Sequence, residues 1–202
     1  MTEARDDGAM RPEPVLDFWF DRAGHAARGE SLLPRRCWWE KDPAFDAEIR
    51  IRFGDAVEAA IGGNFGGWQE TAEGALALLI LLDQFPRNLF RGDARAFAGD
   101  ERARAVAYAA IGRGFDVALP PVMRQFLYMP FEHSENLADH DVGLPLFAAL
   151  DKALPGYRIL DYAEQHRAII ARFGRYPHRN AVIGRASTRE ETAFLAQPGS
   201  SF

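Results

Sequence analysis

Apolar residues recur every three or four positions along most of the chain, a spacing that places them on one face of an α-helix. One such pattern predicts a helix that begins after Asp42, a residue suited to the N-cap, and ends at Gly62. The next covers residues 71–83 and includes the run ALALLILL. This run is too short to span a bilayer of about 30 Å, so it predicts a helix in the protein core. Pro86 is expected to end that helix.

The second half of the chain continues the helical pattern. Asp100 is expected as the N-cap of a third helix. Further helices are predicted over residues 121–129, 131–139, 144–154 and 157–173. Gly143 and Pro145 predict a break between two of them, and Gly174 fits a left-handed C-cap after the last. Ser187 matches the first position of a capping box that opens a short terminal helix.

No segment shows the alternating pattern of a β-strand with a hairpin turn, so the fold class is predicted to be all-α. The short connections favour antiparallel helical hairpins. We expect residues 1–13 to form a flexible N-terminal segment and residues 14–202 to form a single domain.

The net charge and the lengths of the apolar runs argue against nucleic acid and membranes as binding partners. A net charge of −5 and a pI near 5.6 argue against general nucleic-acid binding, which depends on neutralising phosphates. The acidic N-terminus does not fit a signal peptide, and no apolar run is long enough for a membrane span. A cytoplasmic protein with no membrane association is therefore expected. Cys37 is the only cysteine, which excludes an intrachain disulfide.

Three polar segments interrupt the apolar helices and supply the candidate site residues. The first follows Pro86 and contains Arg87, Asn88 and Arg91. These side chains can cap the last carbonyls of the preceding helix, where arginine also complements the helix dipole. Alternatively, the two arginines can bind a carboxylate or a phosphate.

The second segment places Glu132, His133 and Glu135 directly after the apolar sequence FLYMPF. Close carboxylates can carry out acid–base chemistry, or can join a histidine at a metal ion. They can equally form a buried network, because a buried acid or histidine needs a partner. The sequence leaves these alternatives open.

The third segment, FGRYPHRNAVIGR, follows a helix whose apolar face includes His166. Its candidate residues are Arg175, His178, Arg179 and Asn180. A loop stiffened by proline with two guanidinium groups, an imidazole and an amide can bind an anion, or can cap two flanking helices. His166 is interpreted as an inward-facing core residue that could also join a site.

Familiar catalytic motifs are absent from the chain. It contains no HExxH, no G-x-S-x-G and no glycine-rich loop followed by Lys-Ser or Lys-Thr. The sequence therefore identifies no cofactor, assigns no residue as a metal ligand and leaves the catalytic residues unknown.

Several segments together resemble the domain of unknown function 924 family. They are VLDFWF, WWEKDPAFD, LLILLDQFPRNLFR, FLYMPFEHSENLADH and HRAIIARFGRYPHRNAVIGRASTREETAFL. The resemblance covers the chain after about Pro14 and implies an all-helical fold similar to tetratricopeptide-type hairpins, without an established reaction. Its signature residues are Asp83, Gln84, Pro86, Arg87, Asn88, the segment 132–135, Gly174, Arg175 and the segment 177–180. Asp139-His140 departs from the acidic-glutamine pair that the family block usually contains.

The leading hypothesis is that the three polar segments converge on one cleft that binds an anionic small molecule or an acidic peptide group. Arg87, Arg175 and Arg179 would donate hydrogen bonds to the anion. Asn88 and Asn180 would orient it, and Glu132 would hold an arginine or His133.

Two alternatives use the same residues. One is an acid–base or metal-assisted hydrolase built on Glu132, His133, Glu135 and His178, with His166 as a further member. The other is a structural or interaction protein in which these side chains form a closed buried network. If these side chains line an open pocket, they form a binding or catalytic site; if they bond only to one another, they form a closed structural network.

Overall fold

The computed structural model describes residues 10–28 and 31–200, and within these ranges it contains helices, turns and loops but no strand. The α-helices are α1 (Pro12–Phe20), α2 (Arg22–Arg28), α3 (Pro43–Ile61), α4 (Ala72–Leu79), α5 (Phe85–Leu89), α6 (Asp100–Gly112), α7 (Pro121–Glu132), α8 (Leu137–Ala153), α9 (Ile159–Phe173) and α10 (Arg189–Leu195). Short 3-10 turns include η4 (Ala94–Phe97) and η5 (Pro177–Arg179). The all-α prediction is confirmed. Of the predicted flexible segment, residues 1–9 lie outside the described residues, and residues 12 and 13 belong to α1.

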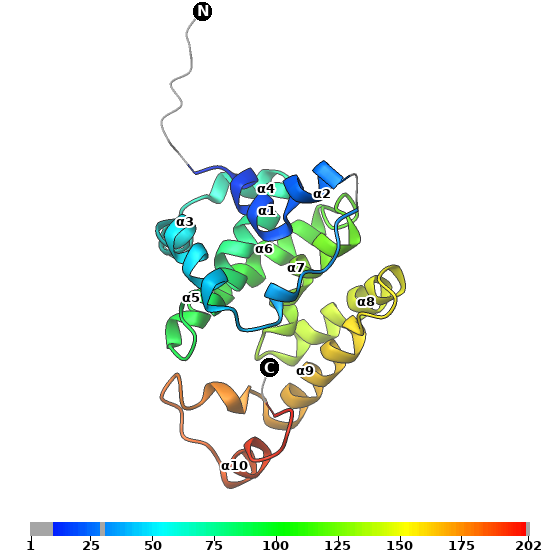
Figure 1. The fold of residues 1–202 in the computed structure, drawn as a ribbon. Helices are drawn as coiled ribbons and strands as arrows, with labels where there is room; N and C mark the ends of the chain where they lie inside the picture. Colours follow the sequence, from blue (N-terminus) through cyan, green and yellow to red (C-terminus); the bar gives the residue numbers. More distant parts are fainter. Residues whose placement is uncertain (1–9, 29–30, 201–202) are drawn as a thin grey trace, which may run out of the picture.

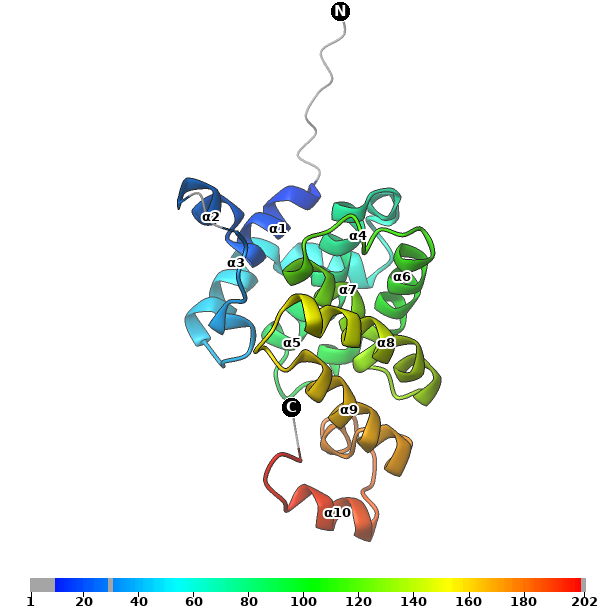
Figure 2. The same ribbon diagram turned by 90° about the vertical axis from the view of Figure 1, so that its right-hand side faces the viewer.

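Helix α4 and the segment after it lie at the centre of the molecule. All eight residues of the run 75–82 are at most 1% exposed, as the sequence predicts for a core helix. Helices α1 and α6 pack against α4, and the chain then continues through α7, α8 and α9, each in contact with the one before it. Figures 1 and 2 show α8, α9 and α10 on one side of the body formed by α1 to α7. No described helix is long and apolar enough to cross a membrane.

Pro86 does not end the helix that contains the apolar run, contrary to the prediction. The chain passes through a π-helical segment, η3 (Ile80–Gln84), and continues as α5 with Pro86 in its first turn. The Phe85 N–H donates to the Ile80 carbonyl, five residues back instead of four. This wider turn lets the helix pass a residue without an N–H, because proline is tolerated where a new helical turn begins.

The predicted break at Gly143 and Pro145 is also absent, because both residues lie inside the continuous helix α8. Gly143 faces α7, where an added Cβ would lie 3.0 Å from the Phe131 Cβ. The glycine therefore allows α7 and α8 to approach closely. Pro145 has no N–H to donate to the carbonyl four residues back, which belongs to Asp141. Asp141 is exposed, so water can bind that carbonyl instead. The turn between the two helices covers residues 133–136, where a helix was predicted.

Four of the predicted helix-cap signals agree with the structure to within one residue. Asp42 caps α3 through its carboxylate, and Gly174 ends α9 with φ of 68°, as predicted. The capping box, however, consists of Thr188 and Glu191, one residue after the predicted pair. Asp100 is likewise the first residue of α6 and not its cap, and its side chain makes no capping bond.

Candidate functional site

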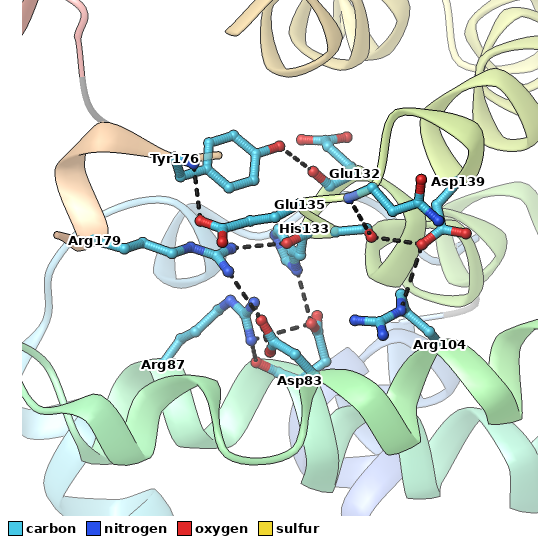
Figure 3. Close-up of polar contacts among 12 residues, drawn as sticks. Asp83, Arg87, Arg104, Glu132, His133, Glu135, Asp139, Tyr176 and Arg179 are labelled. Carbon is cyan, nitrogen blue, oxygen red and sulfur yellow. Dashed lines mark hydrogen bonds and ion pairs between the residues drawn. The ribbon is translucent and has the colours of Figure 1, made fainter. Parts of the chain in front are cut away.

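The end of α7 meets the π-helical segment, the start of α6 and η5 in a group of charged side chains. This polar cluster consists of Asp83, Arg87, Asp100, His133 and Arg179. Figure 3 shows Asp83 and Arg87 on one helix, facing His133 and Arg179. The π turn matters here because it adds a residue to the helix and so changes which side chains face the cluster.

Asp83 and His133 form the centre of the cluster. The His133 Nδ1 lies 2.7 Å from the Asp83 Oδ1, and the Asp83 side chain is 1% exposed. Burial alone would raise the pKa of Asp83, but Arg87, then His133 and a hydrogen bond from Gln84, outweigh it and hold that pKa well below its usual range. Asp83 is therefore ionised and accepts the Nδ1 proton of the ring.

The His133 ring is neutral at neutral pH. Burial lowers its pKa, Arg87 lowers it further, and the attraction of Asp83 only partly opposes them. A neutral imidazole that donates from Nδ1 carries its lone pair on Nε2. Nε2 makes no hydrogen bond with any residue that the structure describes, and the side chain is 12% exposed.

The arginines of the cluster are held by acids. Arg87 lies 3.1 Å from the Asp83 carboxylate and 2.9 Å from Asp100. Arg179 lies 3.2 Å from Asp100, donates to the His133 carbonyl at 2.9 Å and stacks over Phe97 with its guanidinium carbon 4.5 Å from the ring centre. Many of the N–H groups of these two guanidinium groups therefore already have partners inside the protein.

Glu132, His166 and Tyr176 form a second, more deeply buried group behind His133. The Glu132 Oε1 lies 3.0 Å from the His166 Nδ1, and the Tyr176 hydroxyl donates to the Glu132 carbonyl. Burial, followed by the charge of Asp83, raises the pKa of Glu132 to about 8. Burial lowers the pKa of His166 to about 3. Both side chains are consequently neutral at pH 7, which reduces the cost of burying them.

The Glu132→Gln variant should remove a pH dependence of stability. The folded protein keeps the Glu132 proton between pH 4.5 and about 8, whereas the unfolded chain has lost it, so this contribution is complete below pH 4.5 and disappears as the pH rises through 8. The difference in unfolding free energy between wild type and variant should therefore fall by about 2 kcal/mol from pH 6 to pH 8.5. Urea denaturation at both pH values measures it, and the histidine contributions cancel in the comparison. A difference that stays constant or grows with pH would contradict a protonated Glu132.

A pocket of about 340 Å³ opens beside the cluster. We call it the His133 pocket, and its walls are Phe97, Asp100, Glu101, Arg104, His133, Glu135, Arg179 and Ile183.

Two charged side chains of the pocket wall, Arg104 and Glu135, differ in how firmly they are held. Arg104 is 32% exposed, and its one ion pair within the described chain is a 3.4 Å contact from Nε to Asp139. Asp139 already accepts shorter bonds from Tyr108 and Ser134, so it holds Arg104 only loosely. Glu135 is held firmly, because Arg185 donates hydrogen bonds to both of its carboxylate oxygens, at 2.5 and 2.8 Å.

The structure brings together about half of the predicted site residues. Those in or directly behind the pocket are Arg87, Glu132, His133, Glu135, His166 and Arg179. His178 lies close behind them, with its ring centre 5.3 Å from that of Tyr176, and burial lowers its pKa to about 4.

The remaining predicted residues lie elsewhere, so the predicted convergence of all three segments is wrong in part. Asn88 and Arg91 point to Asp46 on α3. Asn88 is turned about 100° around α5 from Arg87, and Arg91 lies beyond the end of that helix. Arg175 and Asn180 both bind Glu191 and tie the loop to α10. Their role is the structural one that the sequence left open.

Sequence reasoning missed three residues of the site and gave a fourth no role. Asp100 is interpreted there as a helix cap, and Arg104 and Tyr176 carry no signal that separates them from ordinary helix and loop residues. Asp83 belongs to the family signature but is assigned no function. Its signal is a carboxylate directly after a very apolar run, because a carboxylate buried there requires a partner.

Among the described residues, no group of three or more His, Cys, Asp and Glu side chains is arranged to hold a metal ion.

Comparisons with known proteins agree with the fold. A family model described as "Bacterial protein of unknown function (DUF924)" matches residues 15–199. The chain is also similar to a solved structure, the protein of unknown function ATU0120 from Agrobacterium tumefaciens, with 42% identity and a TM-score of 0.77. That match covers 92% of this chain and 96% of the other. No curated protein matches the sequence.

Proposed function

Because the chain belongs to the DUF924 family of bacterial proteins of unknown function, its activity has to be inferred from the site, and we propose that the His133 pocket binds a small molecule with an anionic group. We further propose that His133 accepts a proton from that molecule or from a water beside it. The observation that carries the proposal is the Asp83–His133 pair, 2.7 Å apart, with its imidazole in the pocket wall.

The arrangement supports His133 as a general base. A base needs an unprotonated nitrogen at neutral pH, a fixed tautomer and access to the substrate. The buried Asp83 carboxylate fixes the tautomer through Nδ1, burial keeps the ring neutral, and Nε2 remains without a partner among the described residues. Acid–base chemistry is thus favoured over simple retention of a ligand.

Arg104 is the residue best suited to bind the anionic group. Arg87 and Arg179 are engaged by Asp83 and Asp100, so they shape the pocket and do not offer a free guanidinium face. Arg104 lines the pocket and has one ion pair within the described chain, from its Nε, and a guanidinium can bind a carboxylate or phosphate with two parallel hydrogen bonds. This assigns to Arg104 the role that the sequence suggested for Arg87, Arg175 and Arg179.

The dimensions favour a small molecule over a peptide. A volume of about 340 Å³ is near the lower end for small-molecule pockets. Phe97 and Ile183 supply apolar contact opposite the charged groups. A closed structural network accounts for Arg87 and Arg179, but it does not account for a histidine nitrogen left open beside a loosely held arginine.

We also infer that the helices pair as tetratricopeptide-type hairpins, as the family resemblance implies. Support comes from the contacts of α7 with α8 and of α8 with α9, which are consecutive in the chain. Such pairing would place His133 in the turn that closes the hairpin of α7 and α8.

The Arg104→Gln variant should weaken binding of small anions in this pocket about tenfold, because one charge-assisted contact is lost. The measurement is a titration of the protein with acetate, malonate and inorganic phosphate, followed by NMR shifts of residues 97–104. Arg95→Gln is the matched control, since Arg95 is 60% exposed and lies outside the pocket. Equal affinity of the Arg104→Gln variant and wild type would remove Arg104 from the proposal. If no small anion shifts these resonances, the pocket does not bind an anion.

A further inference from the structure

A second depression lies between the start of α3 and the end of α5, away from the His133 pocket. It has a volume of about 290 Å³. We call it the basic cleft, and its walls are Lys41, Pro43, Asp46, Ala47, Arg50, Asn88, Leu89 and Arg91. Asn88 and Arg91, two residues predicted for the main site, are therefore part of a different hollow.

The charge of the basic cleft is opposite to that of the whole chain. Three cations, Lys41, Arg50 and Arg91, face one carboxylate, Asp46, so the walls carry a formal charge of 3 − 1 = +2. The whole chain has a net charge of −5. A local surplus of this size has to be balanced by solvent counterions or by a bound anion.

Asp46 and the α5 carbonyls hold the polar groups of the cleft in place. Asp46 accepts a hydrogen bond from Asn88 at 2.7 Å and two from Arg91, at 2.8 and 3.2 Å. Arg50 donates to the Leu89 carbonyl at 2.5 Å. Fixing long side chains in the free protein removes part of the entropy cost of binding.

Donor groups remain available after these contacts. Arg50 uses one of its five N–H groups in the bond to Leu89, and Lys41 makes no ion pair or hydrogen bond within the part of the chain that the structure describes. The backbone at the start of α3 adds little, because the Asp42 carboxylate already accepts the Ala44 and Phe45 amides. Attraction for an anion would thus come from side chains.

We propose that the basic cleft binds a doubly charged oxyanion, of the kind carried by inorganic phosphate and by phosphate monoesters. The formal charge of +2 matches such a group, and both Arg50 and Lys41 line the hollow. Guanidinium and ammonium groups are the usual protein ligands of phosphate. This site is independent of the His133 pocket and of its proposed function.

The double variant Lys41→Gln/Arg50→Gln tests this site against inorganic phosphate and glycerol phosphate at constant ionic strength. Wild type should show saturable shifts of the Ala47 amide and the Arg50 Nε–H, and the double variant should bind at least tenfold more weakly. The matched control is Arg95→Gln/Arg113→Gln, which removes two cations that are 60% and 42% exposed and lie outside the cleft. Lys41→Arg, which keeps the charge, should retain binding.

One result separates the two sites, and the others identify the ligand or overturn the proposal. Arg104→Gln should leave the shifts in the basic cleft unchanged, because Arg104 belongs to the other pocket. Binding by glycerol phosphate alone would identify the ester as the ligand, whereas equal binding of both probes would identify the shared oxyanion. Wild-type affinity in the double variant, or the absence of saturable shifts with either probe, would overturn the proposal.

Discussion

The Asp83→Ala variant is expected to lose about 3–5 kcal/mol of unfolding free energy, since it breaks a buried ion pair by removing one partner. The Asp83 carboxylate is 1% exposed, lies 3.1 Å from Arg87 and accepts the Nδ1 proton of His133. Without it, Asp100 is the one carboxylate partner left to Arg87 among the described residues, and the His133 ring loses the group that orients it. Urea or thermal denaturation at pH 7 measures the loss.

An exposed ion pair provides the control for this variant. Glu40 and Arg36 are joined by two hydrogen bonds, but their side chains are 57% and 87% exposed. Glu40→Ala should leave the unfolding free energy nearly unchanged, because water screens such pairs. If Asp83→Ala is no more damaging than Glu40→Ala, the polar cluster does not stabilise the fold. Asp83→Asn, which preserves the shape of the side chain, should be less destabilising but should release the His133 tautomer.

The Gly99→Ala variant is expected to cost about 3 kcal/mol or more by overpacking. Gly99 is buried and precedes α6, and an added Cβ would lie 2.1 Å from the Leu82 carbonyl oxygen in the π-helical segment. The obstacle is backbone and cannot rotate away. The φ of −90° at Gly99 is accessible to alanine, so the penalty arises from space and not from conformation. Denaturation measures the penalty.

Gly112 at the other end of the same helix gives the matched comparison. Within the described part of the chain, an alanine Cβ there would meet no atom within 4 Å beyond its own helix backbone and its chain neighbours. Gly112→Ala should therefore be neutral or stabilising by up to about 1 kcal/mol. Similar stability losses at both positions would mean that the contact between Gly99 and Leu82 does not restrict the packing of α6.

The helices were predictable because their information is local. Periodic apolar positions identified the core helix over residues 75–82 and the amphipathic helix that ends at Gly174. The two clear errors, at Pro86 and at Pro145, share a cause. A proline in sequence predicts a helix end, but the three-dimensional surroundings supplied a π turn in one case and an exposed carbonyl in the other.

The site was less predictable because convergence in space is not local. His133, Arg87 and Arg179 stood out as polar residues next to apolar helices, and packing does bring them together. Asn88 lies one position after Arg87 in the same polar segment, but successive residues on a helix point about 100° apart, so Asn88 faces the basic cleft. Arg104 could not be recognised, because an arginine on an amphipathic helix is usually a solvated residue.

The most direct measurement of the central claim is a long-range ¹H–¹⁵N NMR spectrum of the His133 ring as a function of pH. We expect a neutral ring at pH 7 with the proton on Nδ1, bonded to Asp83, and an unprotonated Nε2 whose resonance shifts when a small anion enters the pocket. The Asp83→Asn variant should lose this tautomer preference. A ring that is charged at pH 7, or one that carries its proton on Nε2, would contradict the proposal that His133 acts as a base.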